Sequence, residues 1–269
     1  MSARVAVAQT APRVGELQAN LADAEAMIHS LAGRAELVIF PELFSTGYRR
    51  EGFEHAAMAE PIPDGPTVRR LSRAAADAGV GVIGTILERA DGQVYDTALV
   101  IGAEGHLVGR YRKTHLYPAE RRYFASGEEL VVAGLGAMRV GLAICFEHAF
   151  PEVFTELALR GAELVAIPSA VPVGYEYLLE LRTRARAQDN QVFVAAANLV
   201  GDDGVTTWCG RSMIVNPRGE VVAEAVSDAT GTIIAEVDLR QGAAERDQEP
   251  ALSNRRPELY RHLAPEARG

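Results

Sequence analysis

The stretch that decides the fold is Gly141-Leu-Ala-Ile-Cys-Phe-Glu-His-Ala-Phe-Pro-Glu152. Large apolar residues occupy every second position from Met138 to Ile144, a period typical of a strand. Pro151 then stands where a helix can begin. Cys145 is therefore predicted at the carboxyl end of a buried strand, where open α/β sheets place their chemistry. A thiol there is either a nucleophile or an inert core residue, and this stretch alone does not choose between them.

The composition is that of a soluble globular protein. The 269 residues are 48% hydrophobic and 23% charged, which is enough apolar material for a sizeable core. The net charge of −9 argues against nucleic acid or an anionic membrane as a partner. No run is long enough to span a bilayer, and the apolar run Val5–Ala8 is too short for the core of a signal peptide. Two cysteines make no disulfide framework, so we expect a cytoplasmic protein.

Strand and helix patterns alternate along nearly the whole chain. Strands are predicted at 5–9, 37–40, 80–87, 95–101, 107–111, 138–145, 164–167, 192–197 and 232–237, with two more around a turn at 216–219. Helices are predicted at 16–31, 67–78, 152–160 and 175–189, with a short Arg-rich helix in the tail. The segment 113–129 is irregular. No linker or repeat divides the chain, so residues 1–269 are expected to form a single domain of mixed α/β type.

Three predicted strand ends carry reactive residue types, namely Glu42, Lys113 and Cys145. A carboxylate can take the proton of a thiol, whose thiolate is the real nucleophile. An ammonium can lower the pKa of the thiol and stabilise an oxyanion. Taken singly, the glutamate reads as a turn residue and the lysine as surface charge, but their shared location at strand ends favours a catalytic set.

Three blocks of sequence resemble the signature blocks of the nitrilase superfamily of carbon–nitrogen hydrolases. They are Pro41-Glu42-Leu43-Phe44, Tyr111-Arg-Lys113-Thr-His-Leu116 and the Cys145 stretch, and the tail Asn254-Arg-Arg-Pro-Glu-Leu-Tyr260 resembles the family's C-terminal segment. The closest overall resemblance is to the short aliphatic amidases. It implies an αββα four-layer sandwich, with two mixed sheets face to face and helices outside. It also implies a homodimer or larger homo-oligomer, with residues 240–269 as a tail that packs at the subunit interface.

The resemblance also implies roles. Glu42 matches the general base, Lys113 the oxyanion-stabilising lysine and Cys145 the nucleophile, which together form a Glu-Lys-Cys triad. Glu120 matches a second glutamate that positions the substrate, although a solvated charge paired with a neighbouring arginine is the alternative. The implied mechanism runs through a thioester on Cys145, with the backbone N–H of Phe146 as a second oxyanion donor. It needs no metal and no organic cofactor.

Other residues leave alternatives open. Tyr48 and Trp208 are candidate walls of a substrate pocket, and core packing is an equal alternative for both. Three arginines on the helix 175–189 would fan over different faces. A solvated surface is favoured for them, with burial near the site or at a subunit contact as the alternative. They are Arg182, Arg184 and Arg186.

Several competing motifs are rejected. The glycines of Gly79-Val-Gly-Val-Ile-Gly84 follow a helix and enter a strand, the reverse of a dinucleotide-binding turn. Cys145 and His148 have the spacing of a metal pair but lack further ligands nearby in sequence. His115 as the base of a Cys-His hydrolase would leave Glu42 and Lys113 without roles. Cys209 is interpreted as a small buried apolar residue.

The substrate class rests on one departure from the family pattern. Relatives that act on carboxylate-bearing substrates often have an arginine where this chain has Ala149, so that clamp is missing. Glu147 also stands where aspartate is common, which keeps the charge. We expect hydrolysis of a small primary aliphatic amide, neutral or ω-amino, to a carboxylic acid and ammonia. N-carbamoyl-amine or nitrile hydrolysis with the same catalytic set is the alternative, and a non-catalytic ligand-binding member is a more distant one.

Overall fold

Two 6-stranded sheets carry the architecture of residues 2–48 and 54–260, which a computed structural model describes. The first sheet has the order β14 (Gly231–Asp238), β1 (Ser2–Gln9), β2 (Leu37–Ile39), β3 (Gly81–Ala90), β4 (Gln93–Ile101) and β5 (Leu107–Arg112). The second has the order β13 (Val221–Glu224), β12 (Met213–Val215), β9 (Phe193–Asn198), β8 (Leu164–Ser169), β7 (Met138–Leu142) and β6 (Val132–Leu135).

Each sheet has a parallel centre with antiparallel strands at its sides. Strands β1, β2 and β3 are parallel in the first sheet, as are β7, β8 and β9 in the second. Parallel neighbours need crossover connections, usually helices. These helices are α1 (Leu17–Ser30) and α3 (Pro66–Ala78) for the first sheet, and α4 (Pro151–Leu159) and α5 (Glu176–Asn190) for the second.

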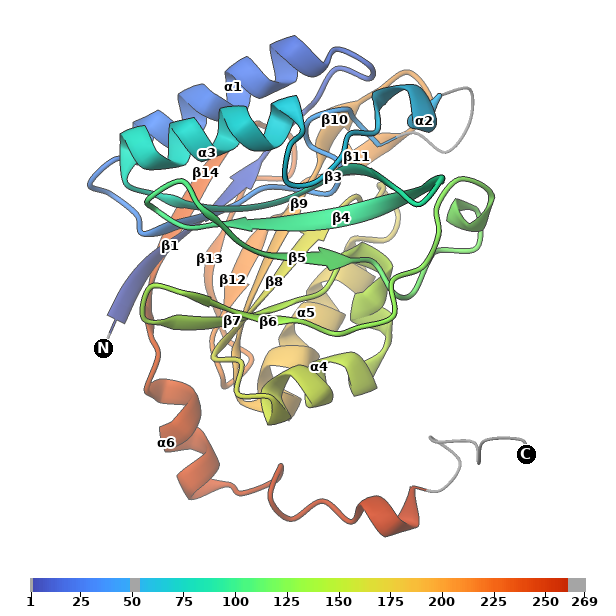
Figure 1. The fold of residues 1–269 in the computed structure, drawn as a ribbon. Coiled ribbons are helices and arrows are strands. Elements are labelled where there is room, and N and C mark those ends of the chain that lie inside the picture. The colour runs from blue at the N-terminus through green and yellow to red at the C-terminus, as the bar shows by residue number, and fades with distance from the viewer. Residues whose placement is uncertain (1, 49–53, 261–269) are drawn as a thin grey trace.

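The two sheets pack face to face, with helices on both outer faces (Figure 1). Val7 and Ile39 from the first sheet share one buried cluster with Leu142 and Leu164 from the second. A separate apolar cluster lies under α1 and α3, and another lies under α4 and α5. The predicted αββα four-layer sandwich is confirmed.

Most predicted elements occur, with shifted ends. The Cys145 strand ends at Leu142, and Cys145 itself begins a 3₁₀ turn that runs to Ala149. The glycine-rich run is a helix-to-strand junction, as expected, because Gly79 ends α3 and β3 begins at Gly81. Elements that the sequence patterns did not indicate are α2 (His55–Met58), β6, β10 (Val200–Asp202) and β11 (Thr207–Cys209).

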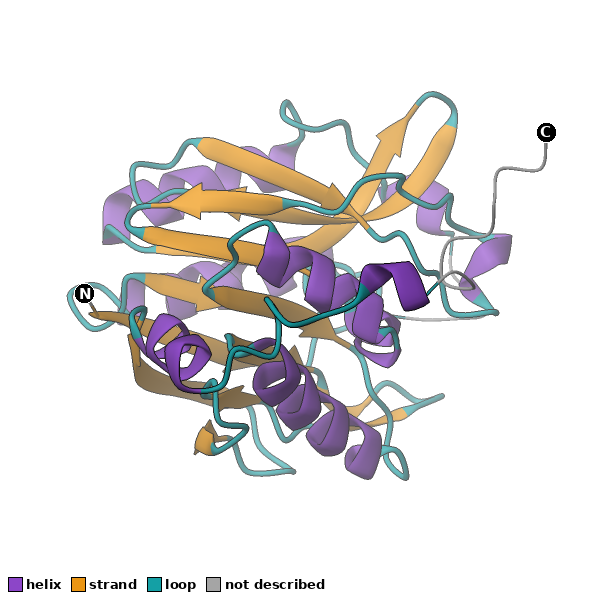
Figure 2. Cartoon of the chain, turned by 90° about the horizontal axis from the view of Figure 1, so that it is seen from below, coloured by secondary structure: helices purple, strands orange, loops and turns teal. Residues whose placement is uncertain are grey.

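The tail differs from its prediction. Its helix, α6 (Gln241–Gln248), lies before the Arg-rich residues, which lead only into a single 3₁₀ turn at Pro257–Leu259. The tail then passes across the lower face of the body (Figure 2). Together with α4 it encloses a hollow of about 930 Å³. Its packing at a subunit interface stays a prediction. None of the helices in residues 2–48 and 54–260 is long and apolar enough to cross a membrane.

The packing between the sheets predicts that truncating two different leucines lowers the free energy of unfolding by very different amounts. Leu164 is fully buried between the sheets, whereas Leu159 on α4 is 49% exposed. Leu164→Ala should lower the free energy of unfolding by about 2–5 kcal/mol, because it leaves a cavity among packed side chains. Leu159→Ala should change it by about 0.5 kcal/mol or less. Urea unfolding followed by circular dichroism measures both, and equal losses would contradict this packing.

Candidate active site

Three strand ends bring Glu42, Lys113 and Cys145 into one cluster. Glu42 follows β2, and Lys113 follows β5, which runs parallel to β3 because one antiparallel strand lies between them. The carboxyl ends of β2 and β5 therefore lie at the same edge of the first sheet. Lys113 Nζ lies 2.6 Å from Glu42 Oε1, and both side chains are fully buried. Cys145 follows β7 of the facing sheet, and its thiol lies within electrostatic range of both.

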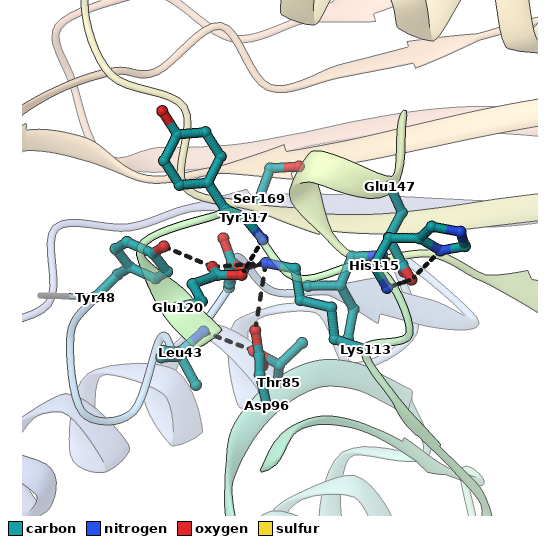
Figure 3. A network of polar contacts seen from close by, with 12 residues as sticks. Leu43, Tyr48, Thr85, Asp96, Lys113, His115, Tyr117, Glu120, Glu147 and Ser169 are labelled. Atoms are coloured by element: carbon teal, nitrogen blue, oxygen red, sulfur yellow. Dashed lines mark hydrogen bonds and ion pairs between the residues drawn. The ribbon is translucent and has the colours of Figure 1, made fainter. Parts of the chain in front are cut away.

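Glu120 joins this cluster from the irregular segment 113–129. Its Oε1 accepts hydrogen bonds from Lys113 Nζ at 2.8 Å and from the Tyr48 hydroxyl at 2.6 Å. Its Oε2 accepts the backbone N–H of Tyr117 at 2.7 Å. Figure 3 shows Lys113 reaching between Glu120 and Asp96. Glu120 is buried and fully bonded, so it is not a solvated loop charge.

Glu147 connects the loop after Lys113 to the turn that carries Cys145. Its Oε1 accepts hydrogen bonds from the Tyr111 hydroxyl at 2.6 Å, the Thr114 hydroxyl at 2.6 Å and the backbone N–H groups of Thr114 and His115 at 2.9 and 3.0 Å. Its Oε2 accepts the backbone N–H of Ile144 at 2.7 Å. Burial alone would raise the pKa of Glu147, but these hydrogen bonds outweigh burial and hold it below its usual value.

This connection fixes a strained backbone conformation at Cys145. Cys145 has a φ of 44°, in the left-handed region that costs a non-glycine residue about 1–3 kcal/mol. Such a conformation persists only where the surroundings impose it. The bond from the Ile144 N–H to Glu147, one residue before the cysteine, supplies that constraint.

Asp96 is a buried carboxyl beside the cluster that the sequence patterns did not indicate. Its Oδ2 lies 3.9 Å from Lys113 Nζ, and no N–H or hydroxyl of the described residues donates to either of its oxygens. The pairing of β4 with β5 could have found it, because Thr97 pairs with Arg112 and the next residues in register are Asp96 and Lys113. A polar residue within the apolar run 94–101 was the available signal.

The cluster holds more carboxyl groups than ammonium groups, so it must retain a proton. Burial raises the pKa of Asp96 well above its usual value, and the Glu42 charge adds to the effect. Burial also raises the pKa of Glu42, against the Lys113 charge. The pKa of Asp96 is raised further above its usual value than that of Glu42, which places the retained proton on Asp96. Burial opposes the charge of Lys113, but Glu120 and Glu42 hold its pKa well above the usual value.

The thiol of Cys145 is protonated at rest. Burial raises the pKa of Cys145 well above its usual value, and the Glu42 charge raises it further. The charge of Lys113 lowers the pKa of Cys145, as expected from the sequence, but by less than burial and the Glu42 charge raise it. The site therefore requires a base at the moment of reaction rather than a preformed thiolate.

A cavity of about 250 Å³ opens onto Cys145. Glu120, Tyr48 and Phe146 line it beside the sulfur, and Arg182 lines it from α5. Its volume suits a small molecule rather than a polymer.

Trp208 stands behind the cavity lining. It is buried, and its ring packs edge-on against Tyr48 with 5.6 Å between ring centroids.

Cys209 is a free, buried thiol that accepts a hydrogen bond from Asn198 Nδ2 at 3.2 Å, as expected for an apolar position. The His115 ring stacks on Phe150 at 4.3 Å. Among the described residues, no group of His, Cys, Asp and Glu is arranged to hold a metal ion.

The arginines of α5 have three different surroundings. Arg184 is exposed and donates to the Gly219 carbonyl at 2.9 Å. Arg186 is buried and donates to the His148 carbonyl at 3.1 Å. Arg182 lines the cavity. The expectation of a solvated surface is therefore correct for Arg184 and wrong for Arg186.

Glu147→Gln tests the connection between the two loops. The amide keeps the shape but turns one acceptor into a donor that faces N–H or O–H groups, so we expect a loss of about 3 kcal/mol in the free energy of unfolding. Glu156→Gln, which removes only an exposed pair with Arg160, should cost about 0.5 kcal/mol or less. Because the folded pKa of Glu147 is lowered, its contribution is complete above about pH 4.3 and declines as pH falls through the folded pKa. Equal urea midpoints for the two variants would contradict the role of Glu147.

Asp96→Asn tests the shared proton. A carboxyl with a raised folded pKa supplies full stability below its unfolded pKa, about 3.9, and loses it as pH rises toward the folded pKa. Asparagine keeps the shape of the aspartic acid side chain without titrating. The variant should therefore gain stability over the natural chain as pH increases above about 4, as measured by urea unfolding from pH 5 to 9. Parallel pH profiles would show that Asp96 is ionised in both states.

Comparisons with known proteins agree with this geometry. The family model for carbon–nitrogen hydrolases matches residues 4–246. The chain is 35% identical to a nitrilase of Pyrococcus abyssi, over 96% of this chain and 98% of the relative. It is 34% identical to the omega-amidase NIT2 of Homo sapiens, over 84% and 85%. A mutant of the amidase of Nesterenkonia sp. AN1 matches with a TM-score of 0.85 at 26% identity, over 97% of both chains, and carries the acetamide moiety of fluoroacetamide covalently added at its active-site cysteine. This chain is therefore an enzyme that belongs to the carbon–nitrogen hydrolase family of the nitrilase superfamily.

Proposed function

We propose that this enzyme is an amidase that hydrolyses a small primary aliphatic amide to a carboxylic acid and ammonia, through a thioester on Cys145. One observation carries the proposal. Lys113 holds Oε1 of Glu42, while no N–H or hydroxyl of the described residues donates to Oε2. Glu42 thus has an oxygen able to take the thiol proton, and burial raises its pKa, which makes it a stronger base.

The first half of the reaction forms the thioester. Glu42 takes the proton of Cys145 as the sulfur attacks the amide carbon, and the carbonyl oxygen becomes an oxyanion. The protonated Glu42 then gives its proton to the amide nitrogen. The carbon–nitrogen bond breaks, ammonia leaves and an acyl group remains on the sulfur.

Lys113 has a donor left for the oxyanion. Its ammonium has three N–H donors, of which two are directed to Glu42 and Glu120 at 2.6 and 2.8 Å. Asp96 at 3.9 Å is too distant to occupy the third. The backbone N–H of Phe146 supplies a second donor in this proposal. Both act in a buried site, where such contacts are strong.

Water completes the cycle. Glu42, ionised again, takes a proton from a water molecule as the water oxygen attacks the thioester carbon. The bond to sulfur breaks, the thiolate of Cys145 takes the proton back from Glu42, and the carboxylic acid leaves. The residues present account for every proton moved, without a metal or an organic cofactor.

Two of the relatives support amides over the alternatives. Nitriles and N-carbamoyl amines would use the same catalytic set, but the name of the human relative specifies an omega-amidase and the Nesterenkonia enzyme is an amidase. A non-catalytic binding protein would have no need of a buried base, ammonium and thiol in one cluster. A cavity of about 250 Å³ limits the substrate to a short acyl chain.

Cys145→Ala should lower the rate of ammonia release from a panel of small amides by about 10³-fold or more, because the nucleophile is removed. Cys209→Ala, the matched change at the other cysteine, should retain the activity, since Cys209 lies outside the cavity lining. Ammonia is measured with a coupled assay, and circular dichroism checks that both variants fold.

Mass spectrometry after a hydroxylamine quench should show hydroxamate, and an acid quench should show an acyl adduct on Cys145. An adduct on Cys209 would overturn the nucleophile assignment. The absence of ammonia release from amides, nitriles and N-carbamoyl amines alike would overturn the proposed function.

A further inference from the structure

Arg182 gives the cavity a positive charge that the catalytic cluster does not use. It projects from α5 and lines the same cavity as Cys145. In the described part of the chain no carboxylate pairs with it, and no hydrogen bond from its guanidinium is present. The other two arginines of α5 do have hydrogen-bond partners, because Arg184 donates to the Gly219 carbonyl and Arg186 to the His148 carbonyl. A guanidinium offers five donors in a planar fork that matches a carboxylate.

The nearby carboxylates are already committed elsewhere. Glu180, two residues away on α5, pairs with Arg211 at 3.2 Å and with Arg184 at 3.4 Å. Glu120 also lines the cavity, but its oxygens accept from Lys113, Tyr48 and the Tyr117 backbone. Within residues 2–48 and 54–260 no anion is therefore supplied to Arg182, and its donors remain available to a ligand.

The wall of the cavity beside Arg182 does not offset this charge. His148 lines the cavity, and its buried Nδ1 has no hydrogen-bond partner among the described residues. Burial, together with the charges of Arg182, Arg186 and Lys113, lowers the pKa of His148 to about 3, so the ring is neutral at physiological pH. The remaining lining on this side is apolar and aromatic and includes Leu178 and Tyr175.

We propose that Arg182 binds a carboxylate of the substrate, so that the preferred amides are short-chain monoamides of dicarboxylic acids. This inference rests on the proposed amidase function and names its substrate class. The guanidinium comes from α5, and it provides what Ala149 lacks in the cysteine turn. It also narrows the expectation from the sequence, because the ammonium of an ω-amino amide would meet a like charge.

The test compares amides of matched chain length whose far end carries a negative charge, no charge or a positive charge. The enzyme is assayed on the monoamides succinamate and glutaramate, on the neutral butyramide and valeramide, and on 4-aminobutyramide. We expect kcat/KM to be highest for the anionic series and lowest for the cationic amide. Arg182→Leu should lower kcat/KM for the anionic series by about 10- to 100-fold, the range of a lost charge-assisted hydrogen bond. It should leave the neutral series within about 3-fold.

Two further variants test whether the effect depends on the charge at position 182 and on its place in the cavity. Arg182→Lys should recover part of the loss, because a point charge replaces a fork. Arg184→Leu, on the exposed side of the same helix, should leave all three series unchanged. Hydrolysis of neutral amides with no preference for anionic ones, or an equal loss in both series in Arg182→Leu, overturns the Arg182 proposal and leaves the amidase function intact.

Binding separates the two proposals when hydrolysis fails. Calorimetry on Cys145→Ala should show succinamate binding that is weakened at least about 10-fold by adding Arg182→Leu. Butyramide binding should not change. If no amide is hydrolysed but this difference is seen, the amidase function fails and Arg182 is still an anion-binding residue. If the difference is absent, the Arg182 proposal fails.

Discussion

The ammonium of Lys113 is fully buried, and it remains charged there because carboxylates surround it. An unpaired buried ammonium would cost several kcal/mol, on the order of the stability of a whole domain. Glu42 and Glu120 offset that cost with short, charge-assisted hydrogen bonds. The same pairing fixes the position of Glu42 relative to the lysine. The proposed base, Glu42, and the proposed oxyanion donor, Lys113, are therefore positioned by the contact that allows either of them to be buried.

A second constraint links this cluster to the nucleophile. Lys113 follows the first sheet and Cys145 follows the second, so the fold alone leaves their relative position to the loops. Glu147 accepts hydrogen bonds from both loops and holds them together. It also secures the left-handed backbone of Cys145. Glu147 thus holds the loop after Lys113 against the turn that carries Cys145.

The sequence predicted the strand ends well because each carries a local signal. A short apolar run followed by Pro41 and Glu42, or an alternating run followed by Cys145, can be recognised without knowledge of the tertiary structure. Asp96 and Glu147 could not be recognised in this way. Their roles depend on strand register and on bonds between loops of two different sheets, which periodicity does not encode. Arg186 was misjudged for a related reason, since helical spacing shows that it faces differently from Arg184 but not that its side packs against the turn that carries Cys145.

The charges of the site also explain why the thiol is kept protonated at rest. A thiolate beside Glu42 would place two anions together in a buried site, which is unfavourable. In the proposed mechanism, the proton stays on sulfur until a carbonyl carbon is within reach, and only then does Glu42 take it. A protonated, partly buried thiol is also less open to oxidation than an exposed thiolate. The arrangement that keeps the thiol protonated therefore also protects it from oxidation.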